Sequence, residues 1–141
     1  MPRARRPSSG PPASSAPRRP ADPRVALGRR AEDAAAAHLA RLGYEIVARN
    51  VRLAGAEIDL VARDGDAIVF VEVRSRSHRR HGGPLETIGA VKRLRIARAA
   101  AAFLARAGAS ARPARFDVLG VDWRGEEPVV SVVRGAFESP T

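Results

Sequence analysis

The chain has 141 residues, of which 45% are hydrophobic and 28% charged, and its formal net charge is +10. This length is typical of one domain with its own core, and the excess of positive charge favours an acidic polymer or surface as partner. The absence of cysteine excludes disulfides and thiolate metal sites. No apolar run reaches the ~20 residues of a membrane-spanning helix, and the first residues lack the apolar segment of a secretory signal. We therefore expect a soluble, cytoplasmic protein without a membrane segment.

Residues 1–23 are rich in proline, serine and arginine and contain almost no large apolar side chain. Such a segment cannot bury enough surface to offset the entropy of ordering, so it is predicted to be a disordered tail. Five arginines and one aspartate give this tail a charge of +4, which leaves +6 on the predicted folded domain, residues 24–141. The domain is therefore basic in its own right.

The predicted elements begin with an alanine-rich helix from Val25 to about Leu42, which ends at Gly43. Three strands follow, over residues 44–52, 57–62 and 67–74, and the last two are joined by an Asp-Gly hairpin turn. After a basic loop comes a long helix, from about Leu85 to Ala107, with an apolar stripe of Leu94, Ala97, Ala101 and Leu104.

Two further strands are predicted at residues 115–123 and 128–137. The order α-β-β-β-α-β-β predicts an α/β domain with a mixed β-sheet flanked by helices. Its first three strands form a meander, and the second helix is the crossover that brings in the fourth strand.

Two of the strands carry a carboxylate where a core would place another apolar side chain: Asp59 in "EIDLVA" and Glu72 in "AIVFVEV". A buried ionised carboxylate is costly unless a cation meets it. Pairing across the Asp-Gly turn brings Asp59 close to Glu72, and Glu32 on the packing stripe of the first helix can approach them. Oxygen ligands of this kind suit Mg²⁺ or Mn²⁺. From spacing alone, a structural ion pair of Asp59 and Glu72 with Arg74 is an equally good explanation.

Four segments extend this pattern: "GRRAEDAAAAHLARLGYEIVARNVR", "AEIDLVARDGDAIVFVEVRSRS", "VKRLRIARAAAAFL" and "RFDVLGV". In this order, from Gly28 to about Val121, they resemble the YraN-like family of predicted endonuclease-like proteins. That family is similar to the archaeal-type Holliday junction resolvases within the PD-(D/E)XK nuclease superfamily. The resemblance implies a restriction-endonuclease-like fold and favours a functional site over a structural ion pair.

Carried over by position, the resemblance makes Glu32 the helix carboxylate and makes Asp59 and Glu72 the strand ligands of a divalent ion. The backbone carbonyl of Val73 is expected as a further ligand, and Glu32 would hold a second ion or the attacking water. Arg74 stands where the superfamily has a lysine, and it would neutralise the phosphate. The family's glycine before the Glu-Ile-Asp triplet is replaced by Ala56.

The basic residues of the loop and of the next helix are expected to bind the DNA phosphate backbone without reading bases. We therefore expect a metal-dependent endonuclease-like protein acting on DNA, with branched DNA as the substrate by analogy with the resolvases. A dimer would suit cleavage of two strands. The alternative is an inactive nucleic-acid-binding module, because a guanidinium at residue 74 stays protonated, and a purely structural domain is a third possibility. The expected DNA contacts are Arg76, Arg79, Arg80, Lys92, Arg93 and Arg95.

Overall fold

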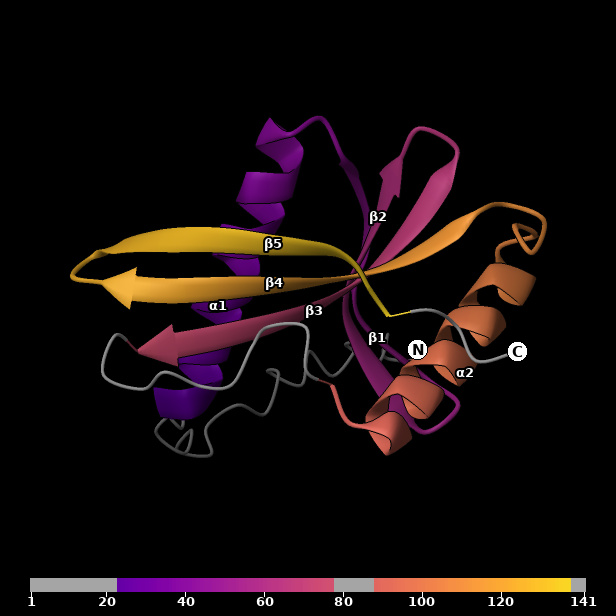
Figure 1. Ribbon diagram of the computed structural model, residues 1–141, viewed down its shortest axis with the longest axis horizontal. Coiled ribbons are helices and arrows are strands. Elements are labelled where there is room, and N and C mark those ends of the chain that lie inside the picture. The colour runs from indigo at the N-terminus through magenta and orange to yellow at the C-terminus, as the bar shows by residue number, and fades with distance from the viewer. Residues whose placement is uncertain (1–22, 78–87, 138–141) are drawn as a thin grey trace, which may run out of the picture.

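The structure, a computed structural model, describes residues 23–77 and 88–137. The predicted order of elements is confirmed (Figure 1). Of the predicted disordered tail, only Pro23 lies within the described residues, as the first residue of a helix. Neither helix in these two ranges is long and apolar enough to cross a membrane. The elements are α1 Pro23–Arg41, β1 Glu45–Leu53, β2 Ala56–Asp64, β3 Ala67–Ser77, α2 Ala90–Arg106, β4 Ala114–Arg124 and β5 Glu127–Phe137.

The strands form one mixed sheet in the order β1-β2-β3-β4-β5, in which β3 and β4 are parallel and all other neighbours are antiparallel. The predicted α/β architecture with a crossover helix is therefore confirmed. Pairing between β2 and β3 ends at Leu60 and Val71, whereas β3 continues beside β4 as far as Ser77. On the N-terminal side of Leu60, where β2 begins, the two strands separate, and Figure 1 shows β2 and β3 running apart. This fork in the sheet is where Asp59 and Glu72 lie.

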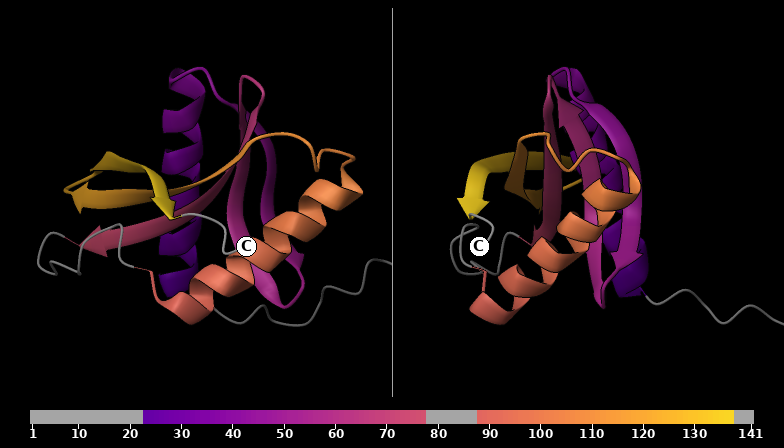
Figure 2. Two further views of the ribbon diagram at one scale, coloured as in Figure 1. Left: turned by 45° about the vertical axis from the view of Figure 1, so that its right-hand side comes forward. Right: turned by 90° about the vertical axis from the view of Figure 1, so that its right-hand side faces the viewer.

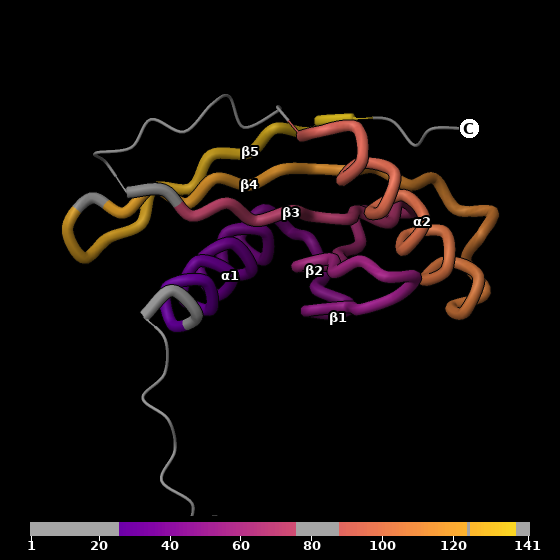
Figure 3. The backbone as a smooth tube through the Cα atoms, turned by 90° about the horizontal axis from the view of Figure 1, so that it is seen from below, coloured from indigo at the N-terminus to yellow at the C-terminus, as the bar shows by residue number. Residues whose placement is uncertain are grey.

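The two helices cover opposite faces of the sheet (Figures 2 and 3). α1 packs with Val69 and Val71 on one face, and α2 packs with Ile68 and Phe70 on the other. The predicted alternation along β3 is thus confirmed, because successive side chains of a strand point to opposite faces. Glu72 has the same parity as Phe70, so it belongs to the α2 face.

Glycines with positive φ set the turns that bound the first two strands. α1 ends in a Schellman motif, in which Gly43 has φ 92° and the amide of Tyr44 donates to the carbonyl of Leu39 over 3.0 Å. The β1–β2 turn is formed by Ala54 and Gly55, with φ 51° and 78°. The conformation that favours glycine therefore falls on Gly55, and Ala56 begins β2 as an ordinary strand residue.

The prediction for α2 was wrong in two respects. The helix begins at Ala90, not near Leu85, since Gly89 is extended (φ −61°, ψ 151°) and Ile88 is inserted into the core with 1% of its surface exposed. The predicted stripe is also misplaced, because Leu94 is 40% exposed and Ala101 is exposed as well. The buried face consists of Ile96, Ala97, Ala99 and Ala100, with Phe103 and Leu104 packed beside them.

Aromatic packing explains this rotation of α2. All four phenylalanines of the chain form a row that runs from α2 across β3, β4 and β5. Phe103 meets Phe70 edge-on with 5.9 Å between ring centroids, Phe70 stacks on Phe116 at 5.5 Å, and Phe116 stacks on Phe137 at 4.6 Å. Burying these large rings stabilises the core more than burying a stripe of alanines.

Candidate active site at the fork of the sheet

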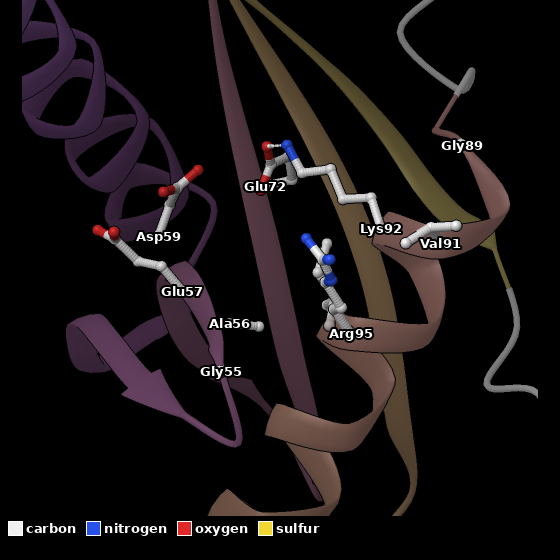
Figure 4. Close-up of a pocket in the computed structure, with 10 residues that line it drawn as sticks. Gly55, Ala56, Glu57, Asp59, Glu72, Gly89, Val91, Lys92 and Arg95 are labelled. Carbon is white, nitrogen blue, oxygen red and sulfur yellow. Dashed lines mark hydrogen bonds and ion pairs between the residues drawn. The ribbon is translucent and has the colours of Figure 1, made fainter.

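A groove of about 650 Å³ opens at the fork, between β2, β3 and the first turns of α2. Glu57 and Asp59 lie on one side of it (Figure 4). Lys92 and Arg95 lie on the other side, and Glu72 stands between the two sides. The groove therefore sets carboxylates from two strands against cations from one helix. Its remaining lining residues are Gly55, Ala56, Gly89, Val91 and Ile96.

Asp59 occupies the first position at which β2 no longer pairs with β3. Its Oδ2 accepts a hydrogen bond from the backbone amide of Val73 over 2.8 Å. The side chain thus satisfies an amide that has lost its strand partner, and unsatisfied buried amides are costly. Since the N–H and C=O of one strand residue leave on the same side, the carbonyl of Val73 also faces the side of Asp59.

Electrostatics at Asp59 are unfavourable for its charge. Its pKa is raised from 3.8 to about 7, chiefly because burial penalises the ionised form. The negative charge of Glu72 is the next largest cause, and those of Glu32 and Glu57 add to it, while the amide of Val73 acts in the opposite direction. Glu32, half-buried on α1, is therefore within electrostatic reach of the groove although its helix covers the other face of the sheet.

Asp117 on β4 is a buried acid with a structural role, and it provides a comparison for Asp59. It is 1% exposed, and Arg115 donates to both of its carboxylate oxygens over 2.9 and 3.1 Å. The amide of Gly135 adds a third bond of 3.0 Å at a β-bulge between β4 and β5. The hydrogen bond to Asp117 and the charge of that carboxylate raise the pKa of Arg115 above its usual range, the hydrogen bond being the largest cause. Asp117 is fully compensated, whereas the charges that shift the pKa of Asp59 are those of three glutamates.

Glu72 meets its cation from the helix side of the groove. Its side chain is 11% exposed, and Oε1 lies 2.5 Å from Nζ of Lys92, whose own side chain is 53% exposed. Lys92 therefore reaches from the surface into the groove to pair with a half-buried carboxylate. Arg95, one turn further along α2, lines the same groove.

The two strand carboxylates are the residues best suited to hold a metal ion. Among the described residues, no group of three or more histidine, cysteine, aspartate or glutamate side chains is close enough together to bind one. Mg²⁺, however, is usually held by one or two carboxylates and keeps several waters. Asp59 and Glu72 supply that number, and a cation between them would relieve the repulsion that raises the pKa of Asp59.

Comparison with known proteins identifies the family. The family model described as "Uncharacterised protein family UPF0102" matches residues 31–121. The chain belongs to the UPF0102 family. A UPF0102 protein of Symbiobacterium thermophilum is 50% identical over 96 residues, which cover 68% of this chain and 81% of the relative. Relatives from an Anaeromyxobacter species and from Moorella thermoacetica are 44% and 47% identical, covering 82% and 78% of this chain and 86% and 93% of their own. The resemblance to the YraN-like family, which is UPF0102, is thereby confirmed.

The part of the chain that matches UPF0102 contains the whole groove, from Gly55 to Ile96. Of the predicted site residues, the structure brings Asp59, Glu72 and Lys92 together. The charge of Glu32 contributes to the raised pKa of Asp59. Arg74 is half-buried two residues beyond Glu72, with the same parity along β3.

The residues predicted to contact DNA lie at different places within this UPF0102 fold. Lys92 and Arg95 line the groove. The Nε of Arg93 instead donates to the carbonyl of Ile88 over 2.7 Å, which fastens the first turn of α2 to the core. The other predicted contacts cannot be placed, since Arg79, Arg80 and the side chain of Arg76 lie outside the described residues.

Sequence reasoning missed one groove residue that bears charge and one structural acid. Glu57 lies in the groove with Asp59, and the two-residue period of β2 was the signal for it. Asp117 is the most deeply buried acid of the described residues, and the Arg-x-Asp spacing of "RFD" was the signal for its partner.

Proposed function

We propose that this protein binds DNA and hydrolyses its phosphodiester bonds with a divalent metal ion, Mg²⁺ or Mn²⁺, as cofactor. The single observation that carries the proposal is Asp59, a carboxylate whose pKa is raised to about 7 beside Glu72, in a groove whose opposite wall is cationic. Strongly perturbed acids in clefts are typical of functional sites. A cytoplasmic location, where DNA is accessible, is part of the same proposal.

Asp59 and Glu72 are the proposed metal ligands, with the carbonyl of Val73 as a third. When bound, the ion supplies Lewis-acid polarisation of the phosphodiester and activation of water. The chain's own contribution is positional. The amide of Val73 fixes the orientation of the Asp59 carboxylate, and Arg74 offers a permanently protonated donor on the same face as Glu72. Glu32 adds negative charge that strengthens attraction of a cation to Asp59.

DNA would approach along the wall formed by α2. Lys92 and Arg95 present their charges on one side of this helix and line the groove with it. The apolar lining from Ala56, Val91 and Ile96 can contact sugars and base faces, but no set of donors and acceptors in the groove resembles a base-reading array. Binding is therefore expected to depend on the phosphate backbone and on salt.

The test is cleavage of labelled four-way junction, duplex and single-stranded oligonucleotides in MgCl₂. We expect the wild type to cut at least one of them and Glu72→Gln to lose about 100-fold or more of that rate. Glu45→Gln is the matched control, since it makes the same chemical change at an exposed pair with Arg63 outside the groove. Equal rates for the wild type and Glu72→Gln would identify a contaminating nuclease and refute the proposal.

A second candidate function is DNA binding without turnover. It is favoured by the guanidinium of Arg74, which stays protonated and so cannot accept a proton from water. This candidate predicts salt-dependent binding of the same oligonucleotides by wild type and Glu72→Gln alike, with no cleavage by either protein. Absence of a gel shift at low salt would count against both functions.

A further inference from the structure

Helix α2, and not only strand β3, provides a cationic side chain at the candidate active site. Lys92 is the only lysine in the chain. Its Nζ lies 2.5 Å from Oε1 of Glu72, in the groove that also contains Asp59. Figure 4 shows the side chain extending across the groove from the first turn of the helix to reach this carboxylate.

The position of Lys92 is unfavourable for the helix itself. It is the third residue of α2, where the positive end of the helix dipole disfavours a cation. The first turn has no acidic residue, and the N-cap, Gly89, provides no side-chain cap. Helix stability therefore does not explain a lysine here, whereas Glu72 or a phosphate group would.

Lysine and arginine can do different things at such a site. The ammonium group of Lys92 has three donors on a flexible stem, so it can keep one hydrogen bond to Glu72 and give another to a phosphate oxygen. Arg74 lies on β3, half-buried, and its planar guanidinium has a fixed donor geometry.

Resting on the proposed function, we infer that Lys92 is a catalytic residue that holds the scissile phosphate against Asp59 and Glu72. Glu72 has two roles in this arrangement, as metal ligand and as the anchor that points Lys92 into the groove. Lys92 also competes with the metal ion for Glu72, since both are cations bound by one carboxylate. Removal of Lys92 should therefore change turnover and metal binding in opposite directions.

The experiment compares the wild type with Lys92→Gln, Lys92→Arg and Arg98→Gln. Arg98 is an exposed residue of α2 that does not line the groove, so Arg98→Gln removes the same charge from the same helix. Single-turnover cleavage of the four-way junction is measured in MgCl₂, binding of the junction is measured in EDTA, and the melting temperature is followed against MgCl₂ concentration.

We expect Lys92→Gln to lower the cleavage rate by about 100-fold, the usual loss when one transition-state donor is removed. Its binding of the junction should fall by much less than its cleavage rate, whereas Arg98→Gln should leave the rate unchanged. The melting temperature of Lys92→Gln should begin to rise at a lower MgCl₂ concentration than that of the wild type. Lys92→Arg keeps the charge but should recover only a small part of the rate, because a planar guanidinium cannot place separate donors on Glu72 and on a phosphate oxygen as an ammonium group can; a purely structural pair with Glu72 would be kept by arginine.

The outcomes separate this inference from the proposed function. Cleavage by Lys92→Gln at the wild-type rate would overturn the role of Lys92 and leave the nuclease proposal intact. A wild type that neither cleaves nor gains thermal stability from MgCl₂ would overturn both. A loss of rate accompanied by an equal loss of binding would also overturn the inference, since Lys92 would then be an ordinary backbone contact.

Discussion

Replacing Asp59 with asparagine should stabilise the protein, and the gain should depend on pH. Asparagine keeps an oxygen that can accept the amide of Val73. It removes the charge that burial penalises and that Glu72, Glu32 and Glu57 repel. Because the pKa of Asp59 is raised in the folded state, the folded protein binds this proton more tightly than the unfolded chain does. Stability is therefore lost as the pH rises from about 4 to about 7, and the loss is complete above that range.

The size of the effect follows from the shift itself. A pKa that moves from 3.8 to about 7 costs about 4 kcal/mol at pH 8, at about 1.4 kcal/mol per unit. Relief of that cost in Asp59→Asn corresponds to a rise in melting temperature on the order of 15 °C for a domain of this size. The gain should shrink by about 1.4 kcal/mol for each pH unit between pH 7 and pH 4.

The assay is urea unfolding followed by circular dichroism in EDTA, at pH values from 4 to 8, with wild type and variant compared at each pH. Asp117→Asn is the matched control, as the same change at a compensated carboxylate. It should destabilise the protein by about 3–5 kcal/mol, since it breaks a buried pair. If Asp59→Asn is no more stable than the wild type at pH 8, or if its gain does not change with pH, the electrostatic account of the groove is wrong.

Three further predictions follow from the same contacts. MgCl₂ should raise the melting temperature of the wild type, because an ion at 100 times its dissociation constant adds about 2.7 kcal/mol to the free energy of unfolding. Asp59→Asn should abolish this rise, and an equal rise in both proteins would place the ion elsewhere. Arg115→Met should lower the free energy of unfolding in urea by about 3–5 kcal/mol, because Asp117 is then buried without its cation, and a loss below about 1 kcal/mol would contradict this. Arg95→Gln should reduce the slope of log K against log salt for duplex DNA by about 1 in fluorescence anisotropy, and an unchanged slope would remove Arg95 from the interface.

Much of the fold could be predicted because local signals and tertiary packing agree. The hairpin at Gly65, the helix end at Gly43 and the alternation along β3 each depend on neighbours in sequence, and each was predicted correctly. The start and the buried face of α2 could not be predicted in this way. They depend on Ile88 entering the core and on Phe103 meeting Phe70, which are contacts between elements.

The candidate site also has features that depend on neighbours in sequence and features that depend on contacts between elements. Strand periodicity was sufficient to put Asp59 and Glu72 on one face, at neighbouring positions. The periodicity did not show that the strands separate at that point, or that an exposed lysine on a later helix reaches Glu72. Lys92 was predicted only as a DNA contact on the helix surface. Its contact with Glu72 was not predicted, because the distance between the two side chains depends on how α2 docks against the sheet.

The hydrogen bond from Val73 to Asp59 limits which amino acids can occupy position 59. One carboxylate there both replaces a missing strand partner and carries the charge of the site. Asparagine would keep the first property without the second, and glutamate would carry the charge on a side chain one carbon longer, which displaces the acceptor. Aspartate alone among the common amino acids combines both, so a single side chain serves the architecture of the sheet and the proposed chemistry of the groove.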